Sequence, residues 1–202
     1  MLTKEQAKAL PQILKKAAES PASNTPNPIS ESMARSVTSR YGKLIEDLLH
    51  TSPGNGLRSI DLGCGATDDT QYQPHVCRTL EKIQRELGCT DARTVGIDRA
   101  QLHDEIFEAH GGVDLQDKAA LDQFESNAWD LITSFGFIGA DHDDPATAPE
   151  LSDLERSEFD GLRKRIIAEV QRLLRDDGVF LCQQRNRIDA IRKRKGSLDL
   201  AV

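Results

Sequence analysis

The sequence predicts an α/β fold in which helices cover both faces of a mostly parallel sheet. Short apolar runs alternate with longer amphipathic segments along the 202 residues, which is the pattern of strands joined by helices. The first of these runs, residues 58–61, leads into Gly63 and Gly65, as at a tight turn after a strand. The second, residues 94–98, ends in the carboxylate of Asp98. Open α/β sheets bind ligands at such carboxyl ends.

The composition is that of a single soluble globular domain, because a chain of this length can bury a sizeable core. No apolar run approaches the roughly 18 residues of a membrane span. The N-terminus lacks the apolar stretch of a secretory signal. The cysteines lack the spacing of a metal site, so we expect no metal and predict reduced core residues of a cytoplasmic protein. They are Cys64, Cys77, Cys89 and Cys182.

The first 28 residues are predicted to be an appendage. Residues 3–6 match a capping box, and apolar residues continue behind it at helical spacing. Pro11 is expected to kink or restart this helix. Residues 20–28 contain three prolines and are typical of a linker. The sequence leaves open whether the appendage packs over the binding site or is mobile.

The remaining elements follow from hydrophobic periodicity and turn residues. They are helices over 30–50, 76–87 and 151–174, and strands over 58–61, 94–98, 106–110, 129–135 and 179–183. Gly88 should end the second of these helices, and residues 176–178 should form a turn. Only 15 residues separate Asp98 from Asp114, so we expect a shortened helix or none before the third strand.

The end of the chain is short and basic. Only 19 residues follow Gln183, and Ile188 and Ile191 could share one short basic helix before an edge strand over 198–202. Six cations against one acid give residues 185–195 a charge of +5, within a chain of net charge −7. A basic segment of this kind is more often a solvated face than a phosphate-binding one. The acidic remainder argues against a general nucleic-acid-binding surface.

The loop after the first strand favours a ligand without phosphate. A dinucleotide fingerprint needs Gly-x-Gly-x-x-Gly, but its third glycine position holds Asp68. Asp61 and Asp68 would also place negative charge beside a pyrophosphate. A ligand that carries an ammonium group and ribose hydroxyls suits the loop better, so a nicotinamide oxidoreductase ranks last.

At residues 61–67 the chain resembles the class I S-adenosylmethionine-dependent methyltransferases, whose first motif reads Asp/Glu-x-Gly-x-Gly-x-Gly. Thr67 replaces the last glycine. The resemblance covers about residues 30–184 and implies a three-layer αβα Rossmann-like fold with S-adenosylmethionine as cofactor. Relatives usually add a helix and an antiparallel hairpin after the fifth strand. We therefore expect a C-terminally trimmed sheet of five to six strands.

The resemblance implies cofactor contacts at the first two strand ends. Asp61 would act near the amino group of the cofactor, with Gly63 and Gly65 admitting the ligand to the backbone. Asp98 would accept charge-assisted hydrogen bonds from two ribose hydroxyls, and its alternative role is a helix N-cap. Arg99 would cover the adenine or lie in solvent.

Further contacts are implied at the third and fourth strand ends. Asp114 and Leu115 match the adenine-binding pair of the family, with Asp117 as the rival acid. Ser134 ends the fourth strand beside the cofactor, and Phe135 begins the acceptor site. His142, beside Asp143 and Asp144, is a substrate-binding candidate that could instead belong to a solvated loop.

The predicted function is S-adenosylmethionine-dependent methyl transfer to a small-molecule acceptor, in a cofactor-binding domain of residues 29–184 followed by a basic tail of residues 185–202. One alternative is a non-enzymatic module that binds S-adenosylmethionine or S-adenosylhomocysteine. Another is a nucleic-acid methyltransferase that uses the tail. The Asn-Pro-Pro-aromatic motif of base-modifying relatives is absent, since residues 134–137 read Ser-Phe-Gly-Phe.

Overall fold

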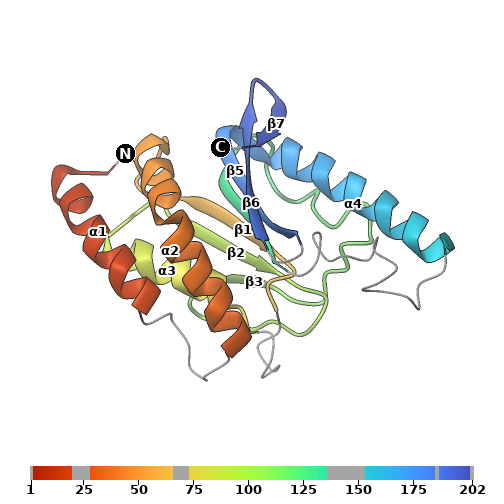
Figure 1. The fold of residues 1–202 in the computed structure, drawn as a ribbon, viewed down its shortest axis with the longest axis horizontal. Coiled ribbons are helices and arrows are strands. Elements are labelled where there is room, and N and C mark those ends of the chain that lie inside the picture. The colour runs from red at the N-terminus through yellow and green to blue at the C-terminus, as the bar shows by residue number, and fades with distance from the viewer. Residues whose placement is uncertain (1, 20–27, 66–72, 136–152, 185–186, 201–202) are drawn as a thin grey trace. The chain divides into compact units, whose positions relative to one another are not determined.

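A computed structural model describes residues 2–19, 28–65, 73–135, 153–184 and 187–200, in two compact units, Met1–Val113 and Asp114–Val202. The described residues form four helices and seven strands (Figure 1).

Three helices lie side by side in the first unit (Figure 1): α1 (Lys4–Glu19), α2 (Pro28–Thr51) and α3 (His75–Glu86). The capping box is confirmed, because the Gln6 amide N–H donates to Thr3 Oγ1 at 3.2 Å and the Thr3 N–H to Gln6 Oε1 at 2.8 Å. Pro11 lies inside an unbroken α1, so the predicted restart is wrong. Burial of one face of α1 against α2 and α3 offsets the cost of the proline, about 3 kcal/mol.

The strands of the first unit lie in the order β3-β2-β1, and both pairs are parallel. They span Arg58–Leu62 (β1), Arg93–Ile97 (β2) and Glu108–His110 (β3). No helix forms between β2 and β3, which is one of the two predicted possibilities. Gly88 follows α3 with φ of 67°, as predicted for a helix end. The carboxyl ends of the three strands therefore share one edge.

The second unit combines parallel and antiparallel pairs in the order β4-β5-β6-β7. Its elements are β4 (Trp129–Ser134), α4 (Asp153–Leu173), β5 (Leu174–Gln184), β6 (Arg187–Arg194) and β7 (Ser197–Leu200). β4 and β5 are parallel, whereas β6 is antiparallel to both of its neighbours. The predicted turn at 176–178 lies within β5, where the register with β4 shifts.

The C-terminus corrects the sequence prediction. Residues expected on a basic helix form β6, and a two-residue turn of Lys195 and Gly196 with φ of 48° and 80° leads into β7. Positive φ at both positions is typical of a tight hairpin turn. Because no helix separates β5 from β6, the short chain suffices for a hairpin. The sheet has seven described strands, so the prediction of five to six strands is wrong. The prediction that the C-terminal hairpin is missing is also wrong.

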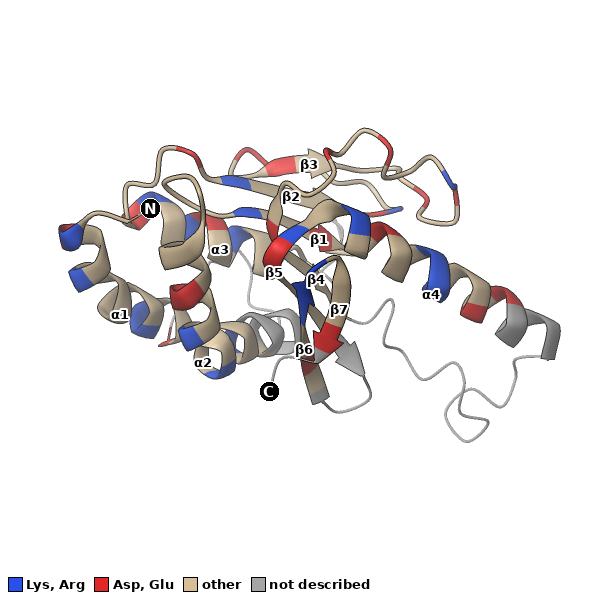
Figure 2. Ribbon diagram, turned by 90° about the horizontal axis from the view of Figure 1, so that it is seen from above, with Lys and Arg blue, Asp and Glu red and all other residues tan. Residues whose placement is uncertain are grey.

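Figure 2 shows Lys and Arg along β6. Some of these basic side chains of the β6–β7 hairpin form hydrogen bonds within the second unit. Lys193 is only 4% exposed, and its Nζ donates to Asn127 Oδ1 at 2.6 Å and to the Leu174 carbonyl at 2.7 Å. Arg192 donates to the Asp177 carbonyl at 3.1 Å. Arg194 and Lys195 are exposed. The basic segment is thus partly a packing element of the second unit.

Arg172 of α4 forms hydrogen bonds with residues 121–126, the segment before β4. Its Nη1 donates to the Phe124 carbonyl at 3.0 Å and to Ser126 Oγ at 2.9 Å, and its Nη2 donates to the Leu121 carbonyl at 2.9 Å. One side chain therefore satisfies three oxygens of an irregular segment. No helix in the described part of the chain has the length and apolarity to cross a membrane.

Candidate functional site

The loop after β1 has the backbone that its glycines predict. Gly63 and Gly65 adopt φ of 70° and 98°, where a side chain would be strained. The N–H groups of Gly63 and Cys64 both donate to the Ile97 carbonyl, at 2.9 and 3.2 Å. The Gly65 N–H donates to Asp98 Oδ2 at 2.9 Å. Three successive N–H groups of the loop therefore point at the end of β2.

This arrangement is unlike a phosphate cradle, which needs loop N–H groups directed at the ligand. In the described part of the loop, residues 63–65 give those donors to Ile97 and Asp98. A carboxylate also stands beside the loop, where it would repel a pyrophosphate. The preference for a ligand that donates hydrogen bonds stays a prediction.

Asp98 connects the loop to the chain beyond β2. Its Oδ1 accepts the Ala100 N–H at 2.8 Å, which forms a turn of the Asx type, while Oδ2 holds Gly65. No helix follows, so the alternative of a helix N-cap is wrong. A carboxylate has about four acceptor positions, and the two backbone bonds leave room for hydroxyl donors. The predicted ribose contact remains chemically open to this half-buried side chain.

Asp61 lies inside the sheet, only 4% exposed, and pairs with Gly96 across β1 and β2. The Cys77 thiol is 3.7 Å from its Oδ2. This carboxylate is therefore buried rather than on the surface. Its role near the amino group of a cofactor stays a prediction.

A small apolar cluster supports the loop from below. It contains Cys64, Cys77, Leu102 and Phe107. For Cys64, the hydrogen bond with Cys77 lowers the pKa, but burial and the charges of Asp61 and Asp98 outweigh it and the pKa is raised. Burial, then the bond with Cys64 and the charge of Asp61, raise the pKa of the Cys77 thiol well above its usual range. Both thiols therefore stay protonated and act by packing.

All four cysteines are free. Cys64, Cys77 and Cys182 are buried, and Cys89 is half-buried. Among the residues that the structure describes, no group of three or more histidine, cysteine or acidic side chains could hold a metal ion.

The second unit carries the predicted adenine pair. Asp114 Oδ1 accepts the Gln116 N–H at 2.8 Å, and Asp117 Oδ1 accepts the Ala119 N–H at 3.0 Å. Both acids therefore make the same local turn, and the choice between them stays open. Leu115 is buried. Arg165 of α4 donates from Nη2 to the carbonyls of Leu115 and Gln116, at 3.2 and 2.8 Å.

Ser134 ends β4 with its side chain fully buried, and Phe135 after it is 8% exposed. Ser134 Oγ has no hydrogen-bond partner among the described residues. An unsatisfied buried hydroxyl costs about 1–3 kcal/mol, so such a group is uncommon unless something else satisfies it. The position is the one at which the sequence predicted a cofactor contact.

The other predicted site residues are less informative. Arg99 is exposed, as in the alternative in which it lies in solvent. His142 lies outside the described residues, together with Asp143 and Asp144.

Two contributors escaped the sequence analysis. A Cβ on Gly96 would lie 2.6 Å from Phe107 Cε2 and 3.0 Å from Cys64 Sγ, so this glycine lets the cluster pack under the loop. A glycine inside a strand is the signal that could have indicated it. The sequence around Arg165 does not indicate its role, since its partners lie about fifty residues earlier in the chain.

Comparisons with known proteins found solved structures only: no protein-family model and no curated protein matches the chain. The MycE methyltransferase, solved with Mg, SAH and mycinamycin VI, is 14% identical over 91% of this chain and 48% of its own, with a TM-score of 0.49. The [4+2]-cyclase SpnF is 18% identical over 89% and 58%, at 0.37. CalS10, an amino pentose methyltransferase from Micromonospora echinaspora solved with SAM, is 13% identical over 86% and 72%, at 0.36.

The chain spans about half the length of the MycE chain that it matches. Its own features are the parallel strands β3-β2-β1, the parallel pair of β4 and β5, the antiparallel end and the Gly63–Gly65 loop anchored on Asp98. With these features the chain has a Rossmann-like α/β fold.

Proposed function

We propose that this protein is an S-adenosylmethionine-dependent methyltransferase that acts on a small-molecule acceptor. The observation that carries the proposal is the loop of residues 63–65, whose N–H groups are all directed at Ile97 and Asp98. Such a loop offers carboxylate acceptors rather than phosphate donors, and S-adenosylmethionine carries an ammonium group and two ribose hydroxyls but no phosphate.

The residues of each unit have separate proposed roles. In the first unit, Gly63 and Gly65 admit the cofactor to the backbone, Asp98 accepts from the ribose and Asp61 acts near the amino group. In the second unit, Asp114 and Leu115 recognise adenine. The unsatisfied hydroxyl of Ser134 supports a ligand contact at the end of β4.

The cofactor would supply a methyl group already activated on a sulfonium, so the protein needs mainly to bind and align donor and acceptor. Transfer forms one bond from methyl carbon to acceptor and breaks the sulfur–carbon bond. The absence of an identified general base is therefore compatible with activity. The free cysteines support a proposed cytoplasmic location.

Methyl transfer itself separates the enzyme from a non-enzymatic binding module. We expect the intact chain to convert labelled S-adenosylmethionine to S-adenosylhomocysteine when small molecules from a cell extract are added, with label in the small-molecule fraction. An Asp98→Ala variant that stays folded serves as the control. Cofactor binding without turnover on any fraction would favour the binding module.

A polynucleotide acceptor is disfavoured by the hairpin. Lys193 is buried and Arg192 is bonded to Asp177, which leaves Arg194 and Lys195 as its exposed, described cations. We expect no binding of tRNA or duplex DNA at physiological salt. Each phosphate contact would otherwise give a log–log salt slope of about −0.9 on duplex and about −0.7 on single strands.

The matched variant for this test is Arg194→Gln with Lys195→Gln. Truncation before residue 185 would be uninformative, since it removes β6, β7 and the internal bonds of Lys193. Micromolar binding of tRNA or DNA with a steep salt slope, lost in the double variant, would favour a nucleic-acid methyltransferase over one that acts on a small molecule.

A further inference from the structure

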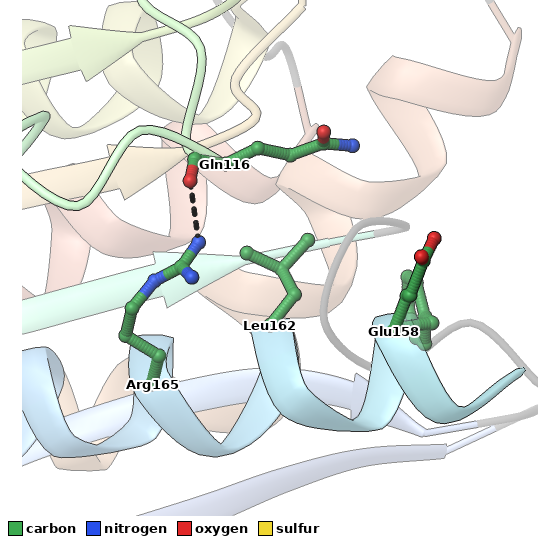
Figure 3. Close-up of a pocket in the computed structure, with 5 residues that line it drawn as sticks. Gln116, Glu158, Leu162 and Arg165 are labelled. Carbon is green, nitrogen blue, oxygen red and sulfur yellow. Dashed lines mark hydrogen bonds between the residues drawn. The ribbon is translucent and has the colours of Figure 1, made fainter. Parts of the chain in front are cut away.

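A pocket of about 330 Å³ lies in the second unit between α4 and the chain at Gln116 (Figure 3). This volume falls at the lower end of the range of small-molecule sites, about 300–1,000 Å³. Four of its five lining residues come from α4: Glu158, Phe159, Leu162 and Arg165. None of the roles proposed above uses the pocket itself.

One face of α4 forms the floor of the pocket. Glu158, Leu162 and Arg165 are spaced by four and then three residues, so they lie along the same side of the helix. Figure 3 shows their side chains extending from α4 toward Gln116. At 1.5 Å per residue, the acid and the arginine are separated by about 10 Å along the axis. The floor therefore has an acidic end, an apolar middle and a basic end.

The acidic and basic ends of the pocket differ in the hydrogen-bonding groups that remain for a ligand. Arg165 already gives both hydrogens of Nη2 to the carbonyls of Leu115 and Gln116, which leaves three of its five donors. Glu158 is exposed, and no described residue pairs with its carboxylate. Between them Leu162 is 9% exposed and Phe159 is half-buried. The pocket thus has a carboxylate with no partner among the described residues at one end, and a fixed hydrogen-bond donor at the other.

We propose that this pocket binds a small amphipathic amine. Its ammonium group lies at Glu158 and its aromatic or aliphatic body on Leu162 and Phe159. A hydrogen-bond acceptor at its other end meets Arg165, and the Gln116 side chain covers the body. The net charge of −7 also favours an organic cation over an anion at an open site. The site depends on its own lining and not on cofactor binding.

The test uses the whole chain with labelled leucine methyls and three probes: tyramine, phenethylamine, which lacks the hydroxyl, and 3-(4-hydroxyphenyl)propionate, which replaces the ammonium with a carboxylate. We expect tyramine to shift the Leu162 methyl resonances in a saturable way, phenethylamine to bind more weakly, and the propionate not to bind. Glu158→Gln should weaken tyramine about three- to tenfold, as for a partly exposed charged hydrogen bond.

Asp122→Asn, a change at another exposed acid of the same unit, should leave tyramine affinity unchanged. Three results would overturn the proposal: no shift with tyramine, equal binding of the propionate, or undiminished tyramine affinity in a folded Glu158→Gln protein. Tyramine binding by a chain that ignores S-adenosylmethionine would uphold the pocket and refute the proposed function, so the two can fail separately.

Discussion

Arg78→Met should lower the free energy of unfolding by about 3–5 kcal/mol, because it leaves a buried carboxylate without its partner. Arg78 Nε donates to Asp104 Oδ2 at 2.7 Å, and the two side chains are 7% and 4% exposed. Asp104 Oδ1 also accepts the Ile106 N–H at 2.8 Å, so the acid fixes the chain that leads into β3. Urea denaturation of the purified variant measures the effect.

A second ion pair of the same unit provides the control. Arg93 and Glu108 bond at 2.8 Å but are 40% and 39% exposed. Hydrogen bonds from Arg93 and then His110 lower the pKa of Glu108 to about 2. Water nevertheless screens an exposed pair, so Arg93→Met should cost less than about 1 kcal/mol.

The double change Arg78→Met with Asp104→Asn should recover part of the loss, since it removes both buried charges and keeps an oxygen that can accept the Ile106 N–H. This variant keeps the test informative if Arg78→Met alone does not fold. Equal costs for Arg78→Met and Arg93→Met would contradict the assignment of a buried structural pair.

Asp98→Ala is expected to weaken S-adenosylmethionine binding about a hundredfold, equivalent to about 3 kcal/mol. Two effects contribute: loss of the ribose acceptor, and release of the Gly65 N–H that Oδ2 now holds at 2.9 Å. Asp122→Ala is the control, because Asp122 is an exposed acid to which no cofactor contact is assigned. It should cost much less.

An analogue of S-adenosylhomocysteine without ribose hydroxyls separates the two effects. If Asp98 contacts the ribose, the unmodified protein binds this analogue more weakly than S-adenosylhomocysteine. The Asp98→Ala protein then binds the two ligands with similar affinity, as in a double-mutant cycle. If Asp98 only positions the loop, the ratio of the two affinities is the same in both proteins. An unchanged dissociation constant in a folded Asp98→Ala protein would show that the end of β2 is not the ribose site.

The first unit was largely predictable because its signals are local. Apolar runs located β1 and β2, and Gly63 and Gly65 indicated the tight turn, in which both have positive φ. The bond between Gly65 and Asp98 was not predictable, since it joins residues that lie 33 apart in sequence. Only the paired strands bring the two together.

The C-terminus was predicted poorly for a different reason. In residues 187–194 the three-residue spacing of Ile188 and Ile191 suggested one face of a short basic helix. Pairing with β5 decided the outcome, and burial of Lys193 against Asn127 and Leu174 depends on that tertiary context. The pocket over α4 likewise depends on Arg165, whose partners are distant in sequence.

Calorimetric titration of the intact chain with S-adenosylmethionine, S-adenosylhomocysteine and NAD measures which class of cofactor the protein binds. Residues 63–65, the described part of the loop, direct their N–H groups at Ile97 and Asp98 rather than at a ligand. We predict saturable heat with both methionine-derived ligands and far weaker binding of NAD. Binding of NAD with no response to either methionine-derived ligand would contradict the account.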